Sequence, residues 1–177
     1  MKRAPVLCIL CLSILLTVSC ATAADPQGEI ENAALLLCST YVDAGDYRAA
    51  ADVCADALTR ISSSRLQYNL AVCLAMAEDW DAAEEAALQG QRDWPDTLSF
   101  IKLRIRFFTM REMYSEVLAV SLEGLEADPW CESFGQSALE AYLMLGMADQ
   151  AKALARTLIG RDICLESARK VLLTGEL

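Results

Sequence analysis

An alanine-rich phrase and its relatives occur four times along the chain, at intervals of 33 or 34 residues. The first runs through 44–58, and related phrases occupy 77–86, 111–117 and 145–151. Self-similarity at an interval near 34 is typical of stacked helix pairs, each pair forming one repeat. Each pair in such a stack contacts mainly its neighbours, so no single central core forms. The repeat therefore predicts an all-α protein that extends along one direction.

The four repeats, aligned as 31–63, 64–97, 98–131 and 132–163, keep one kind of side chain at several positions. Position 20 is small in every repeat, and position 11 is large. The small residues are Ala50, Ala83, Val117 and Ala151, and the large ones are Tyr41, Leu74, Phe108 and Tyr142. Two helices approach closely only where a side chain is small, so position 20 is predicted to lie at the crossing within each pair.

These columns, together with Pro95 and Pro129 at position 32, resemble the tetratricopeptide repeat (TPR) family. The resemblance implies a right-handed α-solenoid of about four TPR-like helix pairs over 30–163, plus a C-terminal capping helix within 164–177. In this family the first helix of each pair, the A helix, lines a concave groove that binds proteins. The second helix of each pair is the B helix.

The first residues are typical of an export signal. Lys2 and Arg3 precede a 13-residue apolar run over 6–18, and small residues follow it. The five residues ending at Cys20 resemble a bacterial lipobox, which implies a signal peptide over 1–19, lipidation of Cys20 and a tether over 20–29. An A-x-A cleavage site at 21–23, giving a secreted protein, and an uncleaved anchor are the alternatives. We expect a lipid-anchored protein of the cell envelope that faces the periplasm or the exterior.

Charge and composition argue against several classes of function. The chain has 15 basic and 25 acidic side chains, a formal charge of −10, and no histidine. Negative charge disfavours nucleic-acid binding, because contacts to phosphate need a basic surface. Without histidine the chain lacks the commonest general base and the commonest metal ligand. We expect no enzymatic activity, no cofactor and no metal site.

Five of the eight cysteines lie beyond the predicted signal region: Cys38, Cys54, Cys73, Cys131 and Cys164. Cys38 and Cys54 stand at positions 8 and 24 of the first repeat, which face each other across the helix pair. They are a candidate disulfide if their geometry suits one, or alternatively two small buried fillers. A second pairing, Cys131 with Cys164, joins two repeat junctions. The redox state stays open at this point.

The TPR resemblance places the partner-binding residues on the A helices. Arg65, Lys102 and Arg106 form a basic centre in an acidic protein, which suggests a carboxylate or an acidic peptide as ligand. Met76, Met110 and Met144 form a further column, either an adaptable apolar floor or packing between repeats. Arg104 stands at a position that should be buried, where snorkelling is the only account the sequence offers. The predicted binding residues are Asn32, Arg65, Tyr68, Asn69, Lys102, Arg106, Gln136 and Glu140.

The sequence therefore predicts a lipid-anchored TPR scaffold or adaptor that binds a protein partner or peptide through its A-helix groove. The alternative is an extracytoplasmic accessory protein of a transport or assembly system that binds a small ligand. An enclosed cavity in place of an open groove would favour that alternative. Association of copies through the exposed end of the array is a further expectation.

Overall fold

The computed structural model describes residues 25–177, and every regular element in that range is a helix. Four A/B pairs follow one another along the chain, and one more helix ends it. The predicted all-α solenoid is confirmed. The predicted signal peptide and Cys20 lie outside the described residues. The pairs are α2 (Pro26–Asp43) with α3 (Tyr47–Leu58), α4 (Ser64–Met76) with α5 (Trp80–Asp93), α6 (Ser99–Met110) with α7 (Tyr114–Ala127), and α8 (Glu132–Met144) with α9 (Ala148–Gly160), followed by α10 (Leu165–Thr174).

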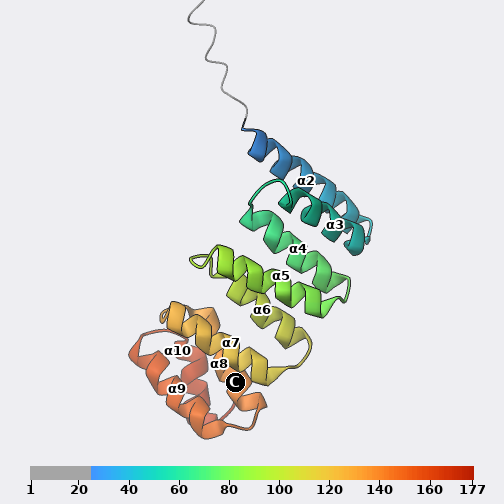
Figure 1. Ribbon diagram of the computed structural model, residues 1–177. Helices are drawn as coiled ribbons and strands as arrows, with labels where there is room; N and C mark the ends of the chain where they lie inside the picture. The colour runs from blue at the N-terminus through green and yellow to red at the C-terminus, as the bar shows by residue number, and fades with distance from the viewer. Residues whose placement is uncertain (1–24) are drawn as a thin grey trace, which may run out of the picture.

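The helices stack in chain order, so that α2 lies at one end of the array and α9 and α10 lie at the other (Figure 1). The first helix begins earlier than expected. Residues 26–29, assigned above to the tether, form its first turn, because Asp25 accepts a hydrogen bond from the Gln27 amide at 3.1 Å and Pro26 suits the first helical position. Any tether can therefore extend no further than Asp25.

The turn inside each helix pair uses one backbone conformation four times. Gly45 and Gly146 have φ of 76° and 72°, the left-handed region that glycine adopts without strain. Glu78 and Glu112 occupy the same place in the middle pairs, with φ of 61° and 56°. The left-handed conformation therefore recurs at the same position of every repeat, and glycine is the residue that adopts it with the least strain.

Position 20 lies at the helix crossings, as predicted. Ala50, Ala83 and Ala151 are fully buried, and Val117 is 3% exposed. Position 24, another small column, is fully buried in all four repeats as well. Its members are Cys54, Ala87, Ser121 and Ala155.

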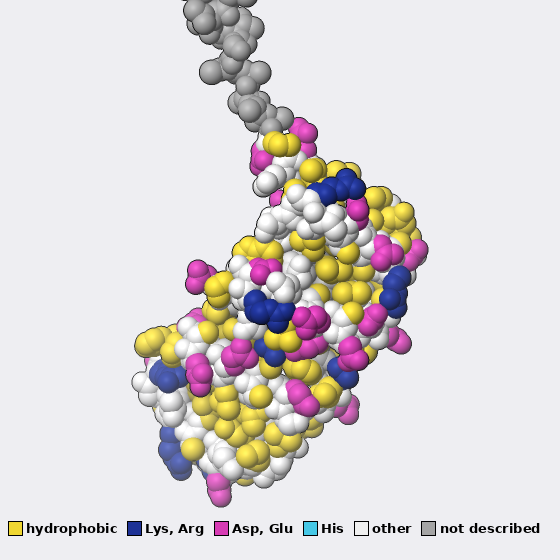
Figure 2. All heavy atoms as spheres, in the orientation of Figure 1, with side chains coloured by type: hydrophobic (Ala, Val, Ile, Leu, Met, Phe, Trp, Pro, Cys, Tyr) yellow, Lys and Arg dark blue, Asp and Glu magenta, His cyan; other side chains and the backbone are white. Residues whose placement is uncertain are grey.

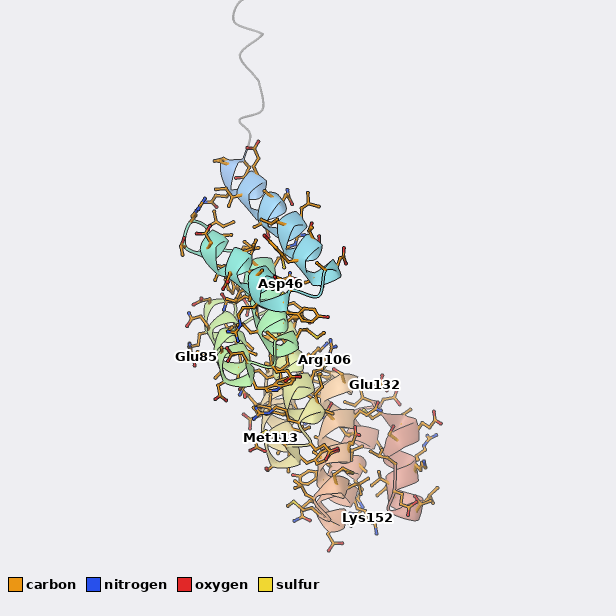
Figure 3. The ribbon with its side chains drawn as sticks, turned by 90° about the vertical axis from the view of Figure 1, so that its right-hand side faces the viewer. Asp46, Glu85, Arg106, Met113, Glu132 and Lys152 are labelled. Atoms are coloured by element: carbon orange, nitrogen blue, oxygen red, sulfur yellow. The ribbon has the colours of Figure 1, made fainter. Side chains whose placement is uncertain are left out.

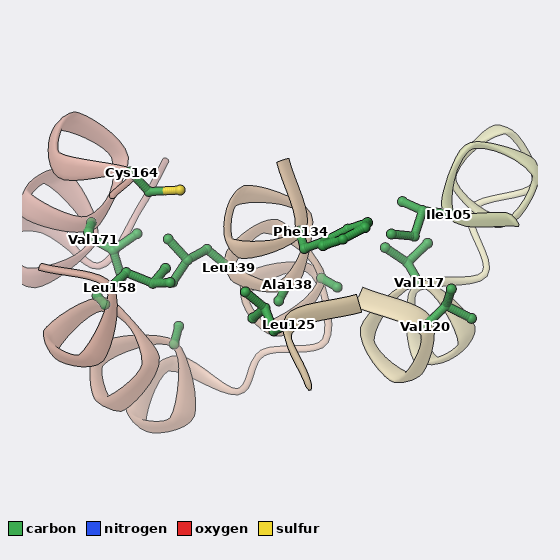
Figure 4. Packing of buried hydrophobic residues seen from close by; sticks show 14 of the residues in the cluster. Ile105, Val117, Val120, Leu125, Phe134, Ala138, Leu139, Leu158, Cys164 and Val171 are labelled. Carbon is green, nitrogen blue, oxygen red and sulfur yellow. The ribbon is translucent and has the colours of Figure 1, made fainter. Parts of the chain in front are cut away.

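Large side chains lock neighbouring pairs together. Phe100, at the start of α6, fills the space over Gly90 of α5, where a Cβ atom would lie 2.2 Å from its ring. Phe134 covers Gly124 in the same way at the next junction, at 2.7 Å. Figure 4 shows the Phe134 ring projecting between its own helix and the side chains of Ile105 and Val117. A ring seated on a glycine in the preceding B helix therefore joins consecutive repeats.

The last helix is a lid on the final pair. Ala168 and Val171 are fully buried and belong to the same apolar cluster as Leu158 of α9. Leu165 and Leu172 are half-buried, and the charged side chains of this helix, Glu166, Arg169 and Lys170, are exposed. The capping helix that was expected within 164–177 is therefore present, with its apolar side toward α9.

Candidate functional site

Two hollows lie between the neighbouring A helices α4 and α6. The first, which we call the polar hollow, has a volume of about 300 Å³. Its lining is hydroxyl, amide and guanidinium groups around one aromatic ring: Ser64, Arg65, Tyr68, Asn69, Thr97 and Ser99. Three of the eight predicted binding residues, Arg65, Tyr68 and Asn69, are thereby brought together.

The second, which we call the methionine hollow, is smaller, about 60 Å³. Arg106 stands at its edge beside Met76 and Met110. The remaining lining is apolar: Val72, Ala75, Leu103 and Phe107. A guanidinium group next to an apolar pocket suits a ligand that presents a carboxylate and an apolar side chain close together.

The three basic residues of the predicted centre differ in how they are paired. Arg65 lies 3.7 Å from Glu31 Oε1, a long ion pair in which Arg65 is exposed and Glu31 is partly buried. Lys102 Nζ lies 5.7 Å from the centre of the Phe134 ring. Within residues 25–177 neither Lys102 nor Arg106 has a carboxylate within ion-pair distance. These two cations are therefore available to an external anion.

The aromatic and amide groups of the polar hollow are already held in place. The Tyr68 ring packs against Phe100, with ring centres 6.1 Å apart. Asn69 Nδ2 donates to the Arg65 carbonyl at 2.8 Å, which leaves the amide oxygen of Asn69 without a partner in the described residues. A ligand donor could use this oxygen while Arg65 binds an acceptor.

The other predicted binding residues lie outside the two hollows. Asn32 is exposed on α2, and Gln136 and Glu140 are exposed on α8. Figure 3 shows Arg106 on the A-helix side of the array, whereas Glu85 belongs to the B-helix side. The predicted residues thus do not form one continuous site.

The methionine column faces solvent. Met76, Met110 and Met144 are 47%, 63% and 57% exposed, so packing between repeats does not account for them. They stand at the ends of α4, α6 and α8, one in each consecutive A helix. Of the two readings of this column, the structure favours the adaptable apolar floor.

Arg104 does not snorkel, and this expectation was wrong. Its side chain is 11% exposed and is held by carboxylates on both neighbouring B helices. Its Nε donates to Glu84 Oε1 at 2.9 Å. Its Nη1 donates to Gln91 Oε1 at 2.9 Å and to Glu123 Oε2 at 3.2 Å. Arg104 therefore joins α5, α6 and α7, and it is a structural residue away from the binding face.

The five cysteines of the described residues are free thiols, so no disulfide joins Cys38 to Cys54 in this structure. Cys38 contacts Cys73 of the next A helix, with 3.7 Å between the two sulfur atoms. Cys164 donates to the Glu132 carbonyl at 3.1 Å, and burial raises the pKa of this thiol to about 11.

Basic side chains stand as small separate groups next to acidic ones on the face shown in Figure 2, with apolar side chains between them. Among residues 25–177, no helix has both the length and the apolar character needed to cross a bilayer.

No protein-family model and no curated protein matches the chain. Among solved structures, a crystal structure of MamA superposes with a TM-score of 0.61 and 20% identity, covering 78% of this chain and 81% of MamA. Another MamA crystal structure gives 0.60 and 20%, covering 87% and 80%. A thermophilic TPR protein from Thermus thermophilus gives 0.52 and 18%, covering 80% and 79%. These likenesses show the fold: the chain is a TPR-like helical-repeat solenoid.

Proposed function

We propose that this protein is a lipid-anchored adaptor of the cell envelope that binds an acidic segment of a partner protein on its A-helix face. The observation that carries the proposal is the pair of hollows between α4 and α6. They combine an apolar pocket with Arg106, a cation that has no carboxylate partner among the described residues.

Charge supports this choice of ligand. The chain carries a formal charge of −10, so a basic pocket on it contrasts with its surroundings. Loss of Lys2 and Arg3 with the signal peptide changes the charge to 13 minus 25, or −12, which sharpens the contrast. A partner segment with carboxylates beside large apolar side chains would pair with Arg65 and Arg106 and bury the exposed methionines.

The shape of the hollows supports a protein partner over a small ligand. A hollow of about 590 Å³ lies open between α2 and α3, and the polar hollow of the A-helix face is open as well. Small-ligand sites usually enclose most of their ligand. We therefore keep the accessory-protein hypothesis as the alternative.

The binding proposal is tested by reversing the charge of the basic centre. The triple variant Arg65→Glu, Lys102→Glu and Arg106→Glu, expressed as the full chain, should lose its cross-linked partners in membranes. A matched control makes the same change of charge at the far end of the array, with Arg156→Glu, Arg169→Glu and Lys170→Glu, all exposed. An unchanged partner list in the first variant, or an equal loss in both, would remove the A-helix face from the proposal.

The anchoring proposal has a separate test. Mass spectrometry of the mature N-terminus should find a diacylglyceryl group on Cys20 and no residue before it. The variant Cys20→Ser should release the protein from membranes while its helical content stays unchanged. An unmodified Cys20, or cleavage after Ala23, would contradict the anchor and leave the binding proposal in place.

A further inference from the structure

Three cysteines from three different helices lie close together at the junction of the first and second repeats. Cys38 of α2 and Cys73 of α4 are each 2% exposed, and Cys54 of α3 is fully buried. The Sγ atoms of Cys38 and Cys73 are 3.7 Å apart, although 35 residues separate them in sequence. Burial is the main cause that raises the pKa of Cys54, and the neighbouring Cys38 and Cys73 raise it further. These three thiols form one cluster, which we call the thiol cluster.

We propose that the thiol cluster is an oxidation site in which Cys38 and Cys73 form a disulfide that ties α2 to α4. This inference does not depend on the proposed function. It differs from the pairing that the sequence suggested, because it rests on the contact between the Sγ atoms of Cys38 in α2 and Cys73 in α4.

Geometry favours this bond. A disulfide has a sulfur–sulfur distance of about 2.05 Å, so the two sulfurs must approach by roughly 1.7 Å. The helix that has to move is α2, the terminal helix, and no described helix packs on its outer side. Terminal repeats of a solenoid are held by one neighbour only, so a small shift of α2 meets less resistance than a shift inside the array.

The other cysteines lack this arrangement. Cys131 Sγ lies 3.2 Å from Ser133 Oγ, and Cys164 donates to a backbone carbonyl of α8. Within residues 25–177 no group of three or more Cys, Asp or Glu side chains is arranged to hold a metal ion, so the thiol cluster is not a metal centre in this conformation. Oxidation to a disulfide is the chemistry open to two buried thiols whose sulfur atoms are in contact.

The reaction is a two-electron oxidation by thiol–disulfide exchange with a small disulfide such as oxidised glutathione. One cysteine thiolate attacks the oxidant, forms a mixed disulfide and releases one glutathione. The second cysteine attacks the mixed disulfide, forms the protein disulfide and releases a second glutathione. The two S–H protons leave to solvent and are regained by the two glutathione thiolates. Two protein thiols are oxidised, and one disulfide of the oxidant is reduced.

Burial keeps the cluster unreactive while the repeat is closed. It is the main cause that raises the pKa of Cys73, to about 12, so the attacking thiolate is scarce at neutral pH. Oxidation therefore proceeds when α2 opens from the array, and the new bond then holds α2 closed. The disulfide closes a loop of 35 residues and should raise the melting temperature by about 5–10 °C.

The test uses the full chain with Cys8, Cys11 and Cys20 replaced by serine, so that the cluster is not confused with the N-terminal thiols. The protein is unfolded in urea, fully reduced, and refolded in a mixture of oxidised and reduced glutathione, so that access to the buried thiols does not limit the reaction. Free thiols are then alkylated, and the protein is digested with trypsin. Cys38, Cys54 and Cys73 fall on separate peptides, spanning 4–48, 49–60 and 66–92.

The expected product is the peptide pair that contains Cys38 and Cys73, with Cys54, Cys131 and Cys164 alkylated. The disulfide-bonded protein should melt higher, and dithiothreitol should remove the difference. The variant Cys54→Ala should keep the linked pair and Cys73→Ala should lose it. A folded product with Cys38 and Cys73 both alkylated, or a dominant link from Cys38 to Cys54, would overturn the proposal.

Discussion

The two halves of the array are packed with different side chains. In the apolar cluster around α2, α3 and the start of α4, seven of the nine buried residues are alanine or cysteine. In the cluster that spans α6 to α10, ten of the sixteen are larger, including Phe134, Leu139 and Leu158. Small side chains bring helices close but remove less apolar surface from water. The C-terminal half should therefore supply most of the stability, and the N-terminal pair should open first.

The first and largest expected effect is a contrast between two fully buried residues, one from each half. Leu158→Ala in α9 should lower the free energy of unfolding by about 2–5 kcal/mol, because it leaves a cavity in the larger cluster. Cys54→Ala in α3 removes one sulfur atom and should cost about 1 kcal/mol or less. Urea titration of both variants measures the two changes in the free energy of unfolding, and equal changes would contradict the difference between the halves.

The second prediction compares two junctions between repeats, the contact of Gly90 with Phe100 and the contact of Gly124 with Phe134. In Gly90→Ala and Gly124→Ala the added methyl group overlaps sterically with the ring of Phe100 or Phe134. Each substitution should destabilise the protein by about 1–3 kcal/mol. Gly160→Ala is the control, since nothing lies within 4 Å of its added Cβ. It should leave stability unchanged or raise it slightly. If Gly90→Ala left the free energy of unfolding unchanged, the contact with Phe100 would not determine how α5 packs on α6.

The third prediction concerns Arg104, which joins α5 of the N-terminal half to α6 and α7. Arg104→Met leaves Glu84 half-buried without its cation and should cost about 1–2 kcal/mol. Arg92→Met removes an exposed ion pair with Glu85 and should stay within about 0.5 kcal/mol. Chemical denaturation distinguishes the two, and equal effects would make Arg104 an ordinary surface charge.

The smallest expected effect is a gain in stability at the turn of the third pair. Glu112 has a φ of 56°, which strains a residue with a Cβ atom, so Glu112→Gly should stabilise by up to about 1 kcal/mol. Glu140→Gly, at an exposed site inside α8, should destabilise by about 1 kcal/mol instead. Thermal melts of the two variants should shift in opposite directions. A loss of stability in Glu112→Gly would show that its side chain contributes more than its backbone costs.

The repeat and its crossings could be predicted because they depend on spacing alone. A small residue every 33 or 34 positions fixes where two helices approach, so Ala50 and Ala151 lie where the sequence put them. The capping helix followed from the same logic, since the last pair would otherwise leave Leu158 uncovered.

Contacts between repeats were harder to predict, because they depend on how far one pair is displaced along the next. Arg104 meets Glu84 from the preceding repeat and Glu123 from its own, so its surroundings depend on how two repeats are placed against each other. The same displacement brings Cys38 into contact with Cys73 and leaves Met110 in solvent. The glycine at 90 followed ten residues later by Phe100, repeated as Gly124 and Phe134, was a signal that sequence reasoning could have used.

One helix belongs to both interiors. Leu103 and Phe107 of α6 are buried in the middle cluster with α4 and α5, whereas Ile101 and Ile105 are buried in the cluster that continues to α10. A fragment that ends after α6 would expose Ile101 and Ile105 to solvent. A fragment that begins at α6 would expose Leu103 and Phe107. The protein therefore has no clean place to be cut in two. A ligand that shifts α6 against α4 would also disturb the packing of Ile101 and Ile105 in the cluster that continues to α10, on the side of α6 away from the ligand.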